Sequence, residues 1–297
     1  MNTPRRNLDA PIAALMVLLC ACWGMQQVAI KLAAPSMGTI FQTGLRSSIS
    51  ALLVVLFMLI RRQPFLSRDR TLWPGIAAGV LFAAEFLCVS VGLNMTSASR
   101  LVVFLYTAPI FTVLGLHWLI PSERLHLAQW LGILLAFIGI AVAFSTGYDG
   151  AGHHTGTLWG DLLGVAAALL WSATTLLIRN STLSEAAPAK TLLYQLVVSA
   201  LLILPLALWS GEVASAHLTA LVWQSLFFQA VIVSFASYLA WFWILRCYLA
   251  SRVAVFSFLT PLFGVGFGML FLHEVVALRF ALGAALVLGG IVMVNRR

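Results

Sequence analysis

Long runs of apolar residues recur ten times along the chain, separated by short polar stretches. A helix needs about 20 apolar residues to cross a hydrocarbon core about 30 Å thick, and each run has roughly that length. Runs such as ALLVVLFMLI (51–60) lack the strict alternation of barrel strands. We therefore predict an all-α integral membrane protein with ten transmembrane helices at 12–31, 38–60, 72–93, 98–119, 126–145, 158–178, 190–209, 220–244, 253–272 and 277–294.

Composition supports a membrane protein. Hydrophobic residues make up 62% of the 297 positions and charged residues only 9%, against roughly 25% charged residues in soluble domains. The first run follows Arg5 and Arg6, but it is too long for the apolar part of a secretory signal peptide, so we expect it to be retained. All four cysteines lie in apolar runs, which predicts neither a disulfide framework nor a zinc site.

The distribution of basic residues predicts the orientation. With the N-terminus inside, thirteen of the 17 Lys and Arg residues fall on cytoplasmic segments, and the outer face keeps Lys31, Arg100 and Arg279. This asymmetry places both termini in the cytoplasm and the chain in the cell's inner (plasma) membrane. We interpret the net charge of +8 as a topology signal and a contact with anionic lipid, not as a nucleic-acid site.

The sequence shows no sign of metal, cofactor or enzymatic chemistry. His153 and His154 are adjacent in the Gly-rich stretch STGYDGAGHHTGT (145–157), without Cys or carboxylate partners at ligand spacing, so we predict no metal site. There is no Walker loop and no nucleophile with a base at usable spacing. A catalytic enzyme is not expected, and ATP would have to come from another chain.

A repeat divides the chain into two halves. ASRLVVFLYTAP (98–109) matches ASRVAVFSFLTP (250–261) at six of twelve positions, and the match extends outward to Trp23 with Trp171 and Glu123 with Glu274. We predict a first five-helix repeat at 1–147, an outer linker at 148–157 and a second repeat at 158–297. Five is odd, so the second repeat is inverted, an arrangement typical of secondary transporters that bind substrate near the midplane and work by alternating access.

These features together resemble the EamA type of the drug/metabolite transporter superfamily. The resemblance covers essentially the whole chain: ten spans in two repeats, Trp23 and Trp171 in mid-helix, a Pro in spans four and nine, and a Glu-then-Gly pattern opening spans five and ten. It implies an exporter of amino acids or other small metabolites, with a central cavity between the halves. It implies no particular substrate, because this family changes specificity freely.

Two ionisable residues lie deep inside predicted spans. Arg46 and Glu85 are each eight residues from the outer end of their span, roughly 12 Å below the surface, where a charge usually has a partner or a function. Their counterparts, Gln195 and Ser237, are uncharged. Three interpretations stay open: a grip on the carboxylate and ammonium of a zwitterion, a proton site at Glu85, or a structural ion pair or hydrogen-bonded neutral carboxyl.

Further candidates surround this pair. Mid-helix tryptophans lie away from the interfacial belt, so they line the pathway or pack between helices. Pro109 and Pro261 each remove a helical hydrogen bond, so we predict a bend in each helix. The bends act either as hinges or as static kinks. The candidate substrate or proton site comprises Trp23, Gln27, Arg46, Glu85, Tyr106, Trp171 and Tyr238, with Gln26 and Trp241 nearby.

Small residues in the predicted spans are expected to allow close packing of helices. They are Gly132, Gly139, Gly283, Gly289 and Gly290.

We therefore expect a secondary active or facilitative transporter that exports small metabolites, and amino acids are the substrate class we favour. One alternative is a proton-coupled multidrug or cation exporter that uses Glu85, although the adjacent Arg46 disfavours it. A second alternative is a membrane receptor or scaffold without flux. The expected partners are a small-molecule substrate, membrane lipid and, in the coupled case, a proton, with either a monomer or a homodimer as the assembly.

Overall fold

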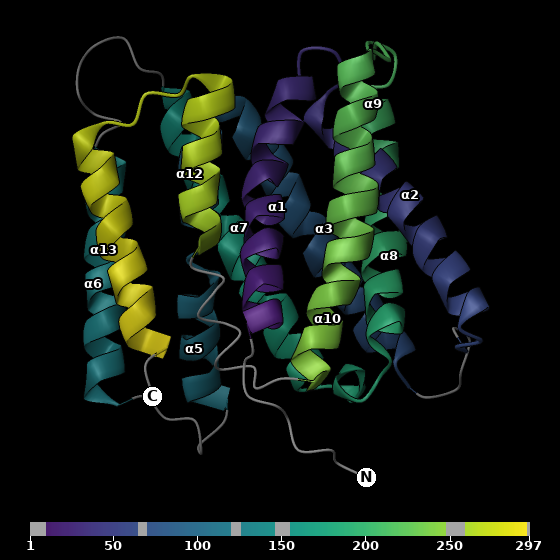
Figure 1. Cartoon of the computed structure of the whole chain (residues 1–297), viewed down its shortest axis with the longest axis horizontal. Coiled ribbons are helices and arrows are strands. Elements are labelled where there is room, and N and C mark those ends of the chain that lie inside the picture. Colours follow the sequence, from purple (N-terminus) through teal and green to yellow (C-terminus); the bar gives the residue numbers. More distant parts are fainter. Residues whose placement is uncertain (1–9, 65–69, 120–125, 146–154, 248–258, 296–297) are drawn as a thin grey trace.

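The computed structural model describes residues 10–64, 70–119, 126–145, 155–247 and 259–295, and within these ranges the chain is nearly all helical and contains no strand. The helices lie side by side along one direction as a bundle (Figure 1). They are α1 (Ala10–Ala33), α2 (Thr39–Ile60), α3 (Leu72–Met95), α4 (Ala98–Leu105), α5 (Ala108–Leu119), α6 (Leu127–Ser145), α7 (Thr155–Arg179), the short 3-10 helix η2 (Thr182–Ser184), α8 (Pro188–Trp209), α9 (Ala220–Phe227), the π-helix η3 (Phe228–Ser237), α10 (Tyr238–Cys247), α12 (Leu259–Leu272) and α13 (Leu278–Asn295).

The described part of the chain has the helices of a multi-pass membrane protein. Seven helical stretches are long and apolar enough to cross a bilayer: 10–33, 39–60, 72–95, 98–119, 157–179, 188–209 and 220–241. Three shorter apolar helices lie at 127–143, 259–272 and 278–293. Large apolar side chains such as Leu52 and Ile60, both 71% exposed, point outward. An apolar exterior of this extent requires lipid.

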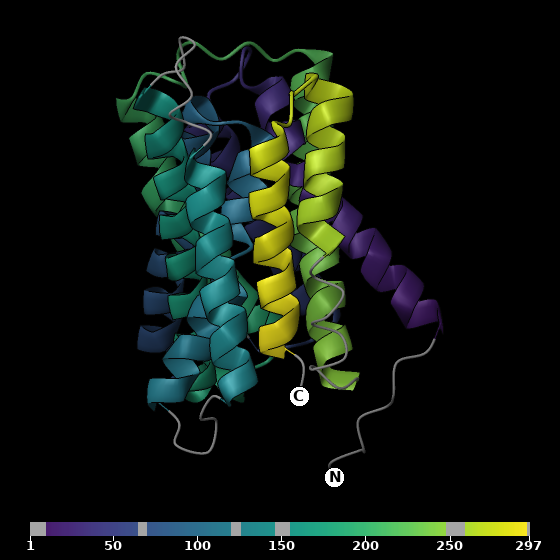
Figure 2. The ribbon, with the colours of Figure 1, turned by 90° about the vertical axis from the view of Figure 1, so that its left-hand side faces the viewer.

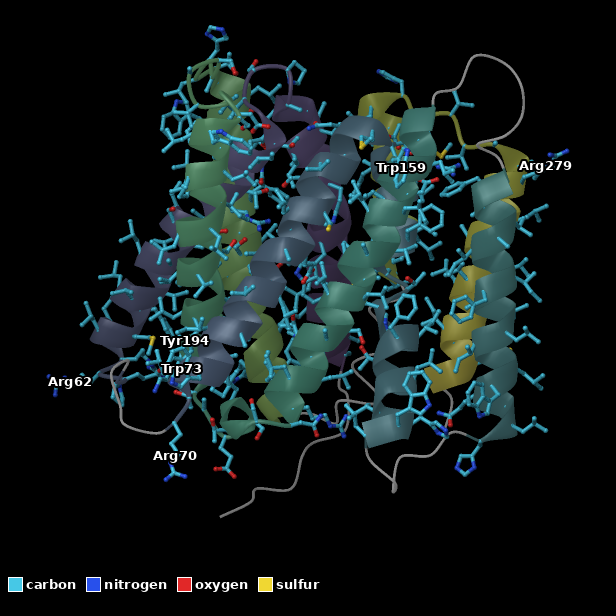
Figure 3. The ribbon with its side chains drawn as sticks, turned by 180° about the vertical axis from the view of Figure 1, so that it is seen from behind. Arg62, Arg70, Trp73, Trp159, Tyr194 and Arg279 are labelled. Atoms are coloured by element: carbon cyan, nitrogen blue, oxygen red, sulfur yellow. The ribbon has the colours of Figure 1, made fainter. Side chains whose placement is uncertain are left out.

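The two ends of the bundle can be told apart. Helix α1 begins and α13 ends at one end, which we call the terminal face, and the α12–α13 connection lies at the other end, the distal face (Figures 1 and 2). Trp73 and Tyr194 lie near the terminal face, and Trp159 lies near the distal face (Figure 3). Trp73 and Trp159 are 77% and 61% exposed, as interfacial tryptophans are expected to be.

The helices overlap the apolar runs of the sequence but differ in their bounds. Helix α7 begins at Thr155, inside the predicted linker 148–157, and the remainder of that linker, with His153 and His154, lies outside the described residues. The predicted bend at Pro109 is instead a break: α4 ends at Leu105, and Pro109 occupies the first turn of α5, where a missing N–H costs nothing. Pro261 likewise lies in the first turn of α12.

A π-helical segment interrupts the rod formed by α9 and α10. Residues Phe228–Ser237 form η3, in which each N–H bonds to the carbonyl five residues earlier. Such segments are rare and frequently lie at functional sites. Helix η3 is joined to α2, because Gln229 Nε2 donates to Gln42 Oε1 at 2.9 Å and Ser50 Oγ donates to the Ala230 carbonyl at 3.0 Å.

Glycines set the close packing of α6 against α13. A Cβ at Gly139 would lie 2.6 Å from the Val287 nitrogen, and one at Gly283 would lie 2.6 Å from the Ala143 nitrogen. No larger side chain fits at either position without moving a backbone, which is how small residues work in membrane helix pairs. Gly289 differs from the expectation, since a Cβ there would make only an ordinary contact at 3.7 Å.

Candidate functional site

Arg46 lies fully buried in α2 with unused hydrogen-bonding capacity. Its exposed fraction is 0%, and its Nε, Nη1 and Nη2 atoms have no hydrogen-bond partner among the described residues. The guanidinium stacks on Phe86, with 4.0 Å from Cζ to the ring centroid. Gln42 and Ser50, one turn to either side, both bond to η3, so Arg46 shares the face of α2 that points to η3. Buried polar groups are usually paired, and Arg46 is a clear exception.

Glu85 is close to Arg46 without being bonded to it. It precedes Phe86 in α3, is 6% exposed and interacts electrostatically with Arg46. The two side chains form no ion pair within the part of the chain that the structure describes. Tyr238, the first residue of α10, interacts electrostatically with both. The structure thus brings Arg46 and Glu85 close together without an ion pair between them.

Trp23 ties α1 to the end of η3. Its indole N–H donates to Ser237 Oγ at 2.9 Å, and its ring meets Trp241 edge to face at 5.5 Å between centroids. Gln27, one turn further along α1, is 3% exposed, and its Oε1 has no partner among the described residues. Both side chains therefore lie on the side of α1 that faces the interior.

Tyr106 and Trp171 complete the group. Tyr106 lies in the break between α4 and α5, 7% exposed, and meets Trp171 of α7 edge to face at 5.3 Å between centroids. It also interacts electrostatically with Glu85 and Tyr238. Six of the seven candidate residues thus form one connected group; we call Trp23, Arg46, Glu85, Tyr106, Trp171, Ser237 and Tyr238 the central cluster. Gln27 is the exception, because its Oε1 has no hydrogen-bond partner among the described residues.

The distal face holds a polar connection that the sequence did not reveal. Glu274, between α12 and α13, accepts hydrogen bonds from the backbone N–H groups of Ala98 and Ser99 at 2.7 and 3.0 Å and from Ser99 Oγ at 2.5 Å. Its carboxylate lies 3.9 Å from Lys31 Nζ. Glu274 therefore occupies the positive end of α4. The one available signal was its alignment with Glu123 in the repeat.

A second connection lies beside it. Asp161 of α7 is fully buried, pairs with Arg100 of α4 and accepts a hydrogen bond from Thr96 Oγ1 at 2.7 Å. Lys31 Nζ donates to the Thr96 carbonyl at 2.5 Å. The contacts of Asp161 with Thr96 and Arg100 join segments before residue 101 to a segment after residue 160. We define Lys31, Thr96, Ala98, Ser99, Arg100, Asp161 and Glu274 as the distal closure.

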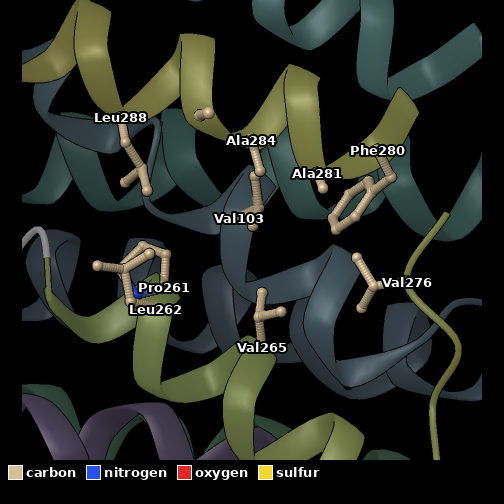
Figure 4. A pocket seen from close by; sticks show the side chains of 10 residues that line it. Val103, Pro261, Leu262, Val265, Val276, Phe280, Ala281, Ala284 and Leu288 are labelled. Carbon is tan, nitrogen blue, oxygen red and sulfur yellow. The ribbon is translucent and has the colours of Figure 1, made fainter. Parts of the chain in front are cut away.

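A separate apolar cavity lies between α4, α12 and α13 (Figure 4). It has a volume of about 220 Å³, and the described residues that line it are all apolar, including Val103, Pro261, Val265, Phe280 and Ala284. None of these side chains could form a hydrogen bond with a polar metabolite. Pro261 thus borders this cavity and is not part of the central cluster.

Sequence comparison identifies the protein's relatives. The model of the EamA-like transporter family matches residues 10–145 and again residues 158–296. The chain belongs to the EamA-like transporter family. This confirms the resemblance seen in the sequence.

Named relatives of this EamA-like chain are transporters. It is 26% identical over 288 residues to the uncharacterized transporter YvbV of Bacillus subtilis (strain 168), covering 96% of this chain and 92% of that protein. It is 28% identical over 295 residues to a probable amino-acid metabolite efflux pump of Escherichia coli (strain K12), covering 95% and 93%. A solved crystal structure shares the fold, with a TM-score of 0.67, 18% identity and 96% coverage of each chain. The protein is a membrane transporter.

Proposed function

We propose that this EamA-like protein is a secondary transporter, active or facilitative, that exports small metabolites, most of all amino acids, through a substrate site at the central cluster. One observation carries the proposal: a guanidinium, a carboxyl and several aromatic rings are buried together in an apolar bundle. A charge at this depth costs several kcal/mol, so it is usually functional. Relatives named as probable amino-acid metabolite efflux pumps in Salmonella typhimurium (strain LT2) and Escherichia coli (strain K12) support the substrate class.

Two inverted five-helix repeats would build this site, and contacts between the halves support that arrangement. A Cβ at Gly24 of α1 would lie 2.7 Å from the Gly264 nitrogen of α12. In the repeat alignment Gly24 corresponds to Ser172 and Gly264 to Thr112, and Thr112 Oγ1 donates to Ser172 Oγ at 3.2 Å. The contact between Gly24 and Gly264 therefore has an equivalent contact between Ser172 and Thr112, in which the two repeats have exchanged roles. An internal two-fold axis requires such matched contacts.

Alternating access would then open and close the two faces in turn. In the proposed orientation both termini are cytoplasmic and the distal face is the outer face of the inner membrane. The distal closure holds that face shut, because it joins Lys31 and Ser99 of the first repeat to Glu274 of the second. It also joins Thr96 of the first repeat to Asp161 of the second. Outward release of substrate requires these bonds to break, which is the rocking of one repeat against the other.

Proton-coupled export of lipophilic cations is the less favoured function. Glu85 would have to exchange a proton for the cation, but Arg46 interacts with the same carboxyl. A cationic drug at this point would meet a like charge at low dielectric, which is costly. The central cluster therefore suits a substrate that carries a negative group as well.

Counterflow in proteoliposomes tests the proposal. Purified protein is reconstituted, loaded with unlabelled amino acids and given labelled amino acids outside, with protein-free liposomes as the control. Saturable exchange of at least one amino acid is expected. Exchange of cationic dyes alone would favour the drug exporter, and no flux of any compound would contradict a transport function at this site.

A further inference from the structure

We infer that Arg46 is the carboxylate receptor of the central cluster and that it selects substrates that carry one carboxylate beside an ammonium group, with Glu85 accepting the ammonium. The inference rests on the proposed function, since it names the chemistry that the same site recognises. It goes further in assigning the selectivity to one residue.

The first step is the contrast between the fully buried Arg46 and the half-buried Arg100. Arg100 bonds to both carboxylate oxygens of Asp161 and to the Ala143 carbonyl, so its charge is neutralised within the fold. Arg46 is more deeply buried, yet none of its three nitrogens has a partner among the described residues. A guanidinium carries five N–H donors, and a buried charge without a partner is strongly destabilising. A structural role would have supplied partners, as it did for Arg100.

The second step is the form of the anion. The planar fork of a guanidinium matches the two oxygens of a carboxylate, and Phe86 covers one face of it, which leaves the hydrogen-bonding edge for the ligand. One carboxylate neutralises this single positive charge. A phosphate dianion would bring a second negative charge that nothing in the central cluster compensates, and a lone cation would repel Arg46.

The third step is the position of Glu85. It interacts electrostatically with Arg46, and the two side chains form no ion pair among the described residues, so the carboxyl of Glu85 is not already bonded to that guanidinium. A carboxyl group has acceptor oxygens in either protonation state, so Glu85 can accept a hydrogen bond from an ammonium N–H. The inference therefore assigns the carboxylate of an amino acid to Arg46 and its ammonium group to Glu85, and leaves the rings of Trp23, Tyr106 and Trp171 for the side chain.

The test compares each amino acid with its amide, which keeps the ammonium and side chain but lacks the carboxylate. Leucine and leucinamide form the first pair, used as competitors in counterflow. Wild-type protein should prefer leucine by at least tenfold, and Arg46→Gln should bring the preference close to one, through weaker binding of leucine with little change for leucinamide. Arg46→Lys keeps the charge without the fork and should retain part of the preference. Arg62→Gln, the same change at an exposed position (Figure 3), should behave as wild type.

A binding measurement separates this inference from transport itself. Tryptophan fluorescence of the protein in nanodiscs is titrated with the same amino acids and amides, and leucinamide binding by Arg46→Gln shows that the variant is folded. Arg46-dependent binding of amino acids without flux would support the inference while contradicting the proposed export. Equal affinities for acid and amide in wild type, an unchanged preference in Arg46→Gln, or no binding of any amino acid would overturn it.

Discussion

Replacing Glu274 by alanine is expected to favour the state in which the distal face is open. The wild-type carboxylate accepts three hydrogen bonds from Ala98 and Ser99, between 2.5 and 3.0 Å, and faces Lys31 at 3.9 Å. All three residues belong to the first repeat, whereas Glu274 belongs to the second. The variant therefore loses contacts that exist only while the distal face is shut.

The size of the effect follows from those contacts. A hydrogen bond to a charged group contributes about 1.5–3 kcal/mol, but water replaces part of each bond when the face opens. Loss of an acceptor at a helix N-terminus costs about 0.5–2 kcal/mol. We take about 2 kcal/mol for the net contribution of the whole contact. Its loss changes the equilibrium constant between the closed and open states by about 30-fold in favour of the open state. Glu274→Gln keeps an acceptor oxygen and should give a smaller shift.

Thiol labelling can measure this shift. Cys20 is fully buried and interacts with Tyr106 of the central cluster, so its reaction with an impermeant maleimide reports access from outside. With the other three cysteines replaced, right-side-out vesicles should show labelling of Cys20 about 10–30 times faster in Glu274→Ala than in the parent. Glu185→Ala, a change at an exposed acid outside the distal closure, serves as the control.

The refuting result is equally specific. If Glu274→Ala labels at the rate of the parent and of Glu185→Ala, while inside-out vesicles label normally, the distal closure does not control access. The reasoning from inter-repeat hydrogen bonds to conformational population would then be wrong.

Three further predictions concern the cluster and the packing. Glu85→Gln should abolish transport driven by a pH gradient in proteoliposomes, and unchanged uptake would remove the proton role of Glu85. Gly283→Leu should lower the unfolding temperature in detergent, since overpacking costs about 1–3 kcal/mol, whereas Gly266→Ala, whose added Cβ meets nothing within 4 Å, should not. Trp23→Phe should cost about 1 kcal/mol of stability through the lost bond to Ser237, and a double-mutant cycle with Ser237→Ala should show that the two losses are not additive.

The helices were predictable because their apolar runs are long. Runs at 38–60, 126–145 and 277–294 differ by a residue or two from α2, α6 and α13. Hydropathy does not report hydrogen-bond pattern, so it gave no sign that residues 228–237 form a π-helix. The break after Leu105 was visible only as a proline signal, because its form depends on a local turn in which Thr107 Oγ1 donates to the Phe104 carbonyl at 2.6 Å.

The candidate site was predictable in part. Arg46 and Glu85 stand out because charges inside apolar runs are rare, but whether they form an ion pair depends on helix rotation, and a helix that is apolar on all sides hides its orientation. Asp161 and Glu274 lie near the ends of predicted spans, where a carboxylate is ordinarily solvated. Only the structure shows that both carboxylates contact residues of the first repeat, Asp161 through Thr96 and Glu274 through Ser99.

The π-helix η3 affects how this chain should be aligned with others. Each of its turns takes in one residue more than an α-helical turn, so η3 can lose a residue by tightening to an α-helix while α9 and α10 keep their own internal geometry. A one-residue gap in this segment would turn α10 about its axis and move Tyr238 away from Arg46. Insertions and deletions at 228–237 therefore change what faces the core, and a relative with a gap there should be expected to present a different side chain to its substrate.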